Sequence, residues 1–258
     1  MVRIMKKSKT ILLFLFLLLA AEGTVRAQSQ SFHPYESGLL VYHGYQFPIV
    51  PGSEEWKALG HLQRVASLQI PLDTLNQMST ARLLETCLYY PFNVDIIAYD
   101  NHLAGYDRMK NQFNGYLELL NRQDFIQCLV SLYNNREIAL VNQMTDDYEK
   151  GRYSFDFQMM EYLFTDAALL ASPNQTEQII SLLVQKLDQK SHYSSIFSSV
   201  SLPITAIAIG RCLQQGYGLS DYQGNTLDAF LQDGTIIKTS DIRYLLEKAR
   251  NINDIKNN

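Results

Sequence analysis

The sequence predicts an all-α protein, either a multi-helix bundle or a solenoid-like stack of α-hairpins, with a short irregular aromatic segment before it. Apolar residues recur at helical spacing from residue 53 onward, and several of these stripes begin at residue types that cap helices. The short connections between the stripes favour antiparallel helical hairpins. A repeat stack would show a recurring period of about 33–45 residues. The sequence shows no such period, so bundle and stack both stay open.

Cap residues and apolar stripes place individual helices. Ser53 and Ser79 are predicted N-caps, because each precedes a run with an inward apolar face. Ser154 is predicted to cap a further helix, and Asn174 to begin another as part of a capping box. The stripe after Ser154 consists of Met160, Leu163, Phe164 and Ala167.

The sequence divides into four segments. Residues 1–27 are predicted to be a signal peptide, and residues 28–52 an aromatic, irregular lead-in rich in tyrosine, glycine and proline. Residues 53–250 are expected to form a single helical domain. The polar stretch 251–258 is expected to be a frayed tail.

The N-terminus has the three parts of a secretory signal peptide. Four basic residues precede the uncharged run Ile11–Ala21, and the small residue Ala27 stands at the expected cut. The run has 11 residues, whereas a helix needs about 20 to span a bilayer. We therefore expect export to the periplasm or the extracellular space, with no stable membrane span after cleavage.

Charge and cysteine content exclude two classes of protein. The leader holds five basic residues and one acidic residue, so its removal changes the formal net charge from −4 to −8. A negative chain without a basic cluster argues against a nucleic-acid partner. Cys87, Cys128 and Cys212 are an odd number of cysteines in apolar helical surroundings, which indicates buried free thiols rather than a disulfide scaffold.

A stretch of 20 residues without formal charge lies between Lys190 and Arg211. Its length alone would allow a membrane span. It contains six serines, a threonine and Pro203, and unpaired hydroxyls are costly in hydrocarbon. We expect a central helix that packs closely through its small residues.

One polar cluster has the residue types of a catalytic site. Asn101, His102, Tyr106 and Arg108 could neutralise a uronate carboxylate, abstract the neighbouring proton and protonate the leaving oxygen. The order Asn-His followed closely by Tyr is similar to that of helical-toroid lyases. The structural alternative makes Asn101 a helix cap, His102 and Arg108 a solvated edge, and Tyr106 part of the core.

The 16 tyrosines suggest a second kind of site. Tyrosine supplies a large contact area at low entropic cost, so it is frequent in recognition surfaces. The default alternative is that each one fills a gap between helices. The candidate binding residues are Tyr35, Tyr42, Tyr45, Tyr89 and Tyr90.

The stretch Ser79–Asn93 (STARLLETCLYYPFN), with Phe113-Asn114-Gly115 downstream, resembles uncharacterised exported proteins of Bacteroidetes-type bacteria. The resemblance covers residues 53–136. It implies a Gram-negative envelope, hence the periplasm or beyond. It implies no activity.

We expect a non-enzymatic exported helical module that binds a protein or peptide partner in the cell envelope, without a cofactor. The sequence has no nucleophile elbow, phosphate-binding loop or zinc-protease motif, and its five histidines have no metal-like spacing. The alternative is a small envelope glycan hydrolase or lyase that uses the Asn101–Arg108 region. Convergence of His102, Tyr106 and Arg108 on one cleft would favour the enzyme, and a groove outside the core would favour the binding module.

Export predicts a defined mature N-terminus. Cleavage after Ala27 should leave a chain that begins at Gln28, because the small side chain of Ala27 suits the signal peptidase. The intact mass and N-terminal sequence of the protein isolated from its native envelope fraction measure this. A chain that still begins at Met1 would contradict the prediction.

Overall fold

The structure, a computed structural model, describes residues 38–197, 202–222, 226–235 and 238–257. Within these residues the protein contains 14 helices and no strand, which confirms the all-α prediction. The elements of the N-terminal half are α2 (Glu54–Ala58), α3 (His61–Ser67), α4 (Leu72–Gln77), α5 (Thr80–Leu88), η1 (Pro91–Ala98), α6 (His102–Lys110) and α7 (Asn114–Asn121). Those of the C-terminal half are α8 (Phe125–Asn135), η2 (Ile138–Gln143), α9 (Asp147–Leu170), α10 (Pro173–Ser191), α11 (Leu202–Gly216), α12 (Leu227–Asp233) and α13 (Thr239–Asn257).

Two of the predicted helix caps are confirmed. The Ser53 hydroxyl accepts a hydrogen bond from the backbone N–H of Trp56 at 3.1 Å and so begins α2. The Ser79 hydroxyl accepts one from the N–H of Arg82 at 3.3 Å and begins α5. Each bond satisfies one of the N–H groups that a helix leaves free at its first turn.

Two other predicted caps are wrong by several residues. Ser154 lies inside α9, which begins two turns earlier, where the Asp146 carboxylate accepts from the N–H of Tyr148. α10 is capped by Ser172 rather than Asn174, and Gln175 completes the capping box. Pro173 occupies the first helical position, where its missing N–H costs nothing.

The ends of the described chain differ in one respect from the prediction. Residues 38–52 are non-helical, as expected for the lead-in, and Tyr42 and Phe47 within them are buried against the helices. The expected frayed tail at residues 251–258 is wrong as far as Asn257, because α13 continues to that residue.

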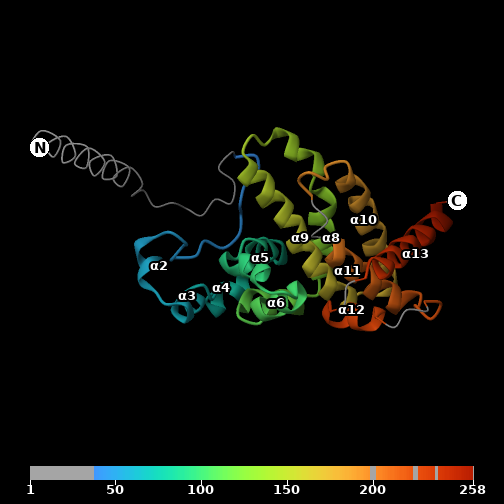
Figure 1. Cartoon of the computed structure of the whole chain (residues 1–258). Coiled ribbons are helices and arrows are strands. Elements are labelled where there is room, and N and C mark those ends of the chain that lie inside the picture. The colour runs from blue at the N-terminus through green and yellow to red at the C-terminus, as the bar shows by residue number, and fades with distance from the viewer. Residues whose placement is uncertain (1–37, 198–201, 223–225, 236–237, 258) are drawn as a thin grey trace, which may run out of the picture.

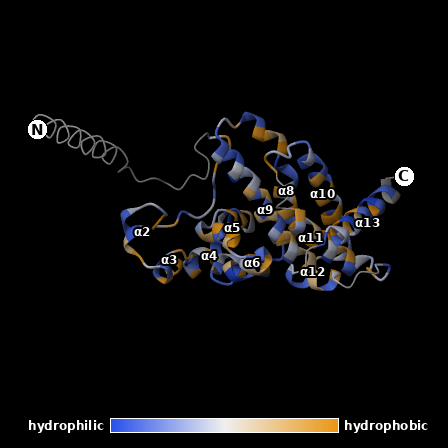
Figure 2. Cartoon of the chain, in the orientation of Figure 1, coloured by the Kyte–Doolittle hydropathy of each residue, from blue (hydrophilic) through white to orange (hydrophobic). Residues whose placement is uncertain are grey.

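The helices pack around α9 and α11. α11 lies against α9, α10 and α13, and α5 lies against α7 and α8. α9 packs against α11, the second helix after it, and α11 packs against α13 in the same way. Contacts between alternate helices occur both in bundles and in stacks of hairpins, so both architectures agree with them. α2 and α3 lie at the opposite end of the molecule from α13 (Figure 1), and the labelled helices carry both hydrophilic and hydrophobic residues (Figure 2).

Among its described residues, the uncharged stretch forms a close-packed internal helix only from Leu202 onward, whereas residues 191–197 form the end of α10 and a largely exposed turn. Ten residues of α11, from Ile204 to Leu213, are buried. A Cβ atom added at Gly210 would lie only 2.3 Å from a methyl group of Leu231, so the glycine allows α12 to approach. No helix among the described residues is long and apolar enough to cross a membrane.

α9 is buried along most of its length although it carries five carboxylates, three of which, Asp156, Glu161 and Asp166, bind neighbouring helices. Met160, Leu163 and Phe164 of the predicted stripe are fully buried, and so are the side chains of Asp156 and Glu161. A buried carboxylate costs several kcal/mol unless it is paired and hydrogen-bonded. The contacts of these groups therefore determine how the neighbouring helices sit.

Asp156 binds the region where α5 and α8 end. Its Oδ2 accepts hydrogen bonds from the Tyr89 hydroxyl at 2.7 Å and from the Arg136 guanidinium at 2.9 Å. Arg152, one turn earlier on α9, lies 3.6 Å from Oδ1. Two cations and one hydroxyl thus compensate one buried anion.

Glu161 and Asp166 have partners of the same two kinds. Glu161 accepts from the Tyr133 hydroxyl of α8 at 2.6 Å and forms an ion pair with Lys190 of α10. Asp166 accepts from the Tyr106 hydroxyl of α6 at 2.8 Å and pairs with Lys110, also at 2.8 Å. Asp156, Glu161 and Asp166 therefore each bind one tyrosine hydroxyl and at least one basic side chain.

Removing one buried partner should destabilise the fold far more than removing an exposed one. Lys190→Met should lower the free energy of unfolding by about 3–5 kcal/mol, because it leaves Glu161 charged and buried. Lys57→Met breaks an exposed pair with Glu54 and should cost less than about 1 kcal/mol. Urea unfolding measures both.

The double variant Glu161→Gln, Lys190→Met should recover part of the loss, since no unpaired charge remains. Equal destabilisation by Lys190→Met and Lys57→Met would contradict this account.

Candidate functional site

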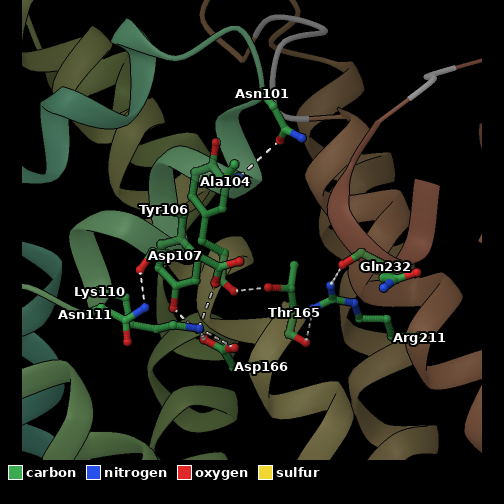
Figure 3. Close-up of polar contacts among 11 residues, drawn as sticks. Asn101, Ala104, Tyr106, Asp107, Lys110, Asn111, Thr165, Asp166, Arg211 and Gln232 are labelled. Atoms are coloured by element: carbon green, nitrogen blue, oxygen red, sulfur yellow. Dashed lines mark hydrogen bonds and ion pairs between the residues drawn. The ribbon is translucent and has the colours of Figure 1, made fainter. Parts of the chain in front are cut away.

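The four candidate catalytic residues lie in different environments, and Figure 3 shows two of them, Asn101 and Tyr106. Asn101 is the N-cap of α6, where its side-chain oxygen accepts from the N–H of Ala104 at 3.1 Å. Its amide nitrogen donates to the backbone oxygen of Asp233 at 2.6 Å, which ties α6 to α12. Both the oxygen and the nitrogen of the Asn101 amide are thus engaged in structural hydrogen bonds.

Tyr106 is fully buried, and its hydroxyl is bound to Asp166. Burial raises the pKa of Tyr106 well above its usual value, and the neighbouring Asp166 carboxylate raises it further. The phenol therefore keeps its proton and donates a hydrogen bond to the Asp166 carboxylate inside the protein. It offers no proton to a substrate at the surface.

Arg108 is exposed and lines a small hollow with residues outside the proposed cluster. Asn101 faces α12, Tyr106 faces the core and Arg108 faces this hollow, so these three side chains do not meet in one cleft. His102, at the first position of α6, is half-buried. The four residues do not form one catalytic centre.

The predicted tyrosine surface is also corrected by the structure. Tyr42, Tyr89 and Tyr90 are at most 7% exposed, so they belong to the core. Tyr42 meets Tyr89 edge to face at 5.4 Å and donates its hydroxyl to the backbone oxygen of Tyr45. Tyr45 is half-buried, and Tyr35 lies outside the described residues. The gap-filling alternative holds for the three buried rings.

A groove of about 620 Å³ lies between α8 and α10. Ile126, Val130 and Leu182 form its apolar floor, and each is less than a tenth exposed. Amide and hydroxyl side chains line the rest: Gln127, Ser131, Asn134, Gln175, Gln178, Ser181 and Gln185. The volume falls within the range of about 300–1,000 Å³ that is usual for ligand sites.

Buried contacts fix the walls of this groove. The Lys186 ammonium of α10 donates to the backbone oxygens of Asn134 at 2.9 Å and Arg136 at 2.8 Å, at the C-terminal end of α8. A cation there suits the negative end of the helix dipole. Glu161 joins the same two helices through Tyr133 and Lys190. The groove is therefore preformed.

None of the described residues that line the groove has an ionisable side chain. Amides can donate and accept hydrogen bonds at the same time, which suits a ligand with both kinds of group.

Sequence reasoning missed this groove although part of its signal was present. Residues 127, 130, 131 and 134 of α8 share one helix face, and so do residues 178, 181, 182 and 185 of α10. That these two faces oppose each other depends on tertiary contacts about 50 residues apart.

The hollow beside Arg108 has a volume of about 120 Å³. His61, Phe92, Asp95 and Tyr99 line it together with Arg108 of α6. Burial raises the pKa of Asp95, and the neighbouring His61 partly offsets this rise. A cleft that holds ionisable groups with perturbed pKa values is a candidate functional site.

Among the described residues no three His, Cys, Asp or Glu side chains are placed to hold a metal ion. The three cysteines are free thiols, with Cys87 and Cys212 buried and Cys128 half-buried. No family model, curated protein or solved structure matches the chain.

Proposed function

We propose that the protein is an exported, non-catalytic helical module that binds a peptide segment of a partner protein in the cell envelope. The observation that carries the proposal is the preformed, uncharged groove between α8 and α10. The export half of the proposal rests on the signal-peptide pattern of residues 1–27.

The lining of the groove favours an extended segment over a helical one. A helix satisfies its own backbone groups, so the amides of Gln127, Gln178 and Gln185 would find little to bind in it. An extended segment presents free N–H and C=O groups, which side-chain amides bind in pairs. The apolar floor then receives a small aliphatic side chain of the peptide.

The absence of charge in the groove restricts the peptide further. No ionisable group lines the groove, so a charged side chain would lose hydration there without gaining a partner. We expect segments of uncharged polar residues and small aliphatic residues. The lining has no aromatic ring either, so a sugar ring would find no stacking platform there.

A display library of random linear peptides, selected on the purified protein, tests this proposal. Peptides enriched on the wild type should lose most of their binding to Ser131→Trp, because the indole fills the groove from its exposed wall. Ser195→Trp, an exposed change in the turn after α10, should bind them as the wild type does.

Gln178→Glu provides a milder variant of the same size. It adds a charge to the uncharged groove and should weaken the selected peptides about fivefold to tenfold, the value of one lost hydrogen bond. Gln123→Glu, exposed outside the groove, is the matched control. A library that yields no enriched peptide, or peptides that bind Ser131→Trp as well as the wild type, would sink the proposal.

A further inference from the structure

The hollow beside Arg108 brings two opposite charges together without pairing them. Asp95 comes from η1 and Arg108 from α6, and both line the same space. Among the described residues neither side chain makes a hydrogen bond or an ion pair. Most charged groups of this fold that are half-buried or buried, such as Asp166 and Lys190, do have such partners.

The unpaired Asp95 carboxylate is partly removed from water. Burial is the main cause that raises its pKa, and only the nearby His61 acts against it. A partly desolvated anion gains more from a ligand cation than a fully hydrated one does. The Arg108 guanidinium can bind a carboxylate with two parallel N–H groups.

The walls of the hollow set the size of its occupant. The Tyr99 ring lies against α6 because residue 105 is glycine: a Cβ atom there would lie 2.8 Å from the ring and 3.0 Å from the backbone oxygen of Ile96. On the other side, the Phe92 ring meets His61 at 5.2 Å. The resulting 120 Å³ is well below the space of a drug-sized ligand.

We propose that this hollow is a binding site for a small zwitterion, namely a free α-amino acid with a small side chain. Its carboxylate binds the Arg108 guanidinium, and its ammonium group binds the Asp95 carboxylate. The rings of Phe92 and Tyr99 flank the short carbon skeleton.

Simpler ions satisfy the site less well. An anion alone would bind Arg108 but would stand beside the Asp95 carboxylate, which His61 compensates only in part. A cation alone would bind Asp95 but would be repelled by Arg108. Only a ligand with both charges a few ångströms apart compensates the two side chains together, and an α-amino acid is the smallest common molecule of that kind.

Titrations of the purified protein with glycine, L-alanine, acetate and methylamine, followed in amide NMR spectra, test the proposal. Glycine or L-alanine should produce saturable shifts at residues 95–108. Acetate and methylamine should each bind at least about tenfold more weakly, because each loses one charge-assisted contact.

Arg108→Gln and Asp95→Asn should each weaken glycine binding by about tenfold or more. Both side chains lack structural partners, so both variants should stay folded. Arg243→Gln and Asp73→Asn, two exposed changes elsewhere, are the matched controls and should leave binding unchanged.

Three results would overturn the proposal: no saturable shift with either amino acid, acetate binding as tightly as glycine, or equal binding by Arg108→Gln and Arg243→Gln. The second would identify a simple anion site. None of these results bears on the α8–α10 groove, because the hollow and the groove share no lining residue.

Discussion

The fold depends on compensating three of the five carboxylates of α9. Asp156, Glu161 and Asp166 follow each other at intervals of five residues, so each points about 140° around the helix from the one before. They therefore reach three different sets of neighbours. Apolar contacts alone do little to fix the orientation of the helices around a helix that is buried on most sides. A buried carboxylate, in contrast, accepts hydrogen bonds only from groups at defined positions.

These contacts also hold the two surface sites in place. Glu161 binds α8 through Tyr133 and α10 through Lys190, so the two walls of the groove share one buried anion. Asp166 holds α6 through Tyr106 and Lys110, and α6 presents Arg108 on its exposed side. Groove and hollow are thus consequences of the same internal pattern. A preformed site loses less conformational entropy when it binds its ligand.

Much of the helical architecture could be predicted from local sequence. The Ser53 and Ser79 caps depend on neighbours three residues away, and the Met160 stripe needs only helical periodicity. The prediction that α9 begins at Ser154 failed because its first two turns, up to Arg152, carry many polar and charged residues and little apolar pattern. The helix forms there with its own Asp146 cap.

The candidate sites were harder to predict because they combine distant segments. The residue types at Asn101–Arg108 suggested chemistry, but Tyr106 turns inward to a carboxylate 60 residues later in the chain. Asp95 and Arg108 line the same hollow only because η1 packs on α6. Tyr89 and Tyr90 suit a recognition surface by type, yet they are buried because the helix they end packs against α7 and α8.

Native-state hydrogen exchange tests the central role of α9 most directly. The account predicts that the backbone amides of α9 between residues 156 and 168 exchange slowest in the protein, and only through global unfolding. It further predicts that Lys190→Met raises the exchange rates of the amides of α8, α9 and α10 together. If the α9 amides exchanged through local opening, at lower free energy than those of α8 and α10, the carboxylates of α9 would not be what holds the bundle together.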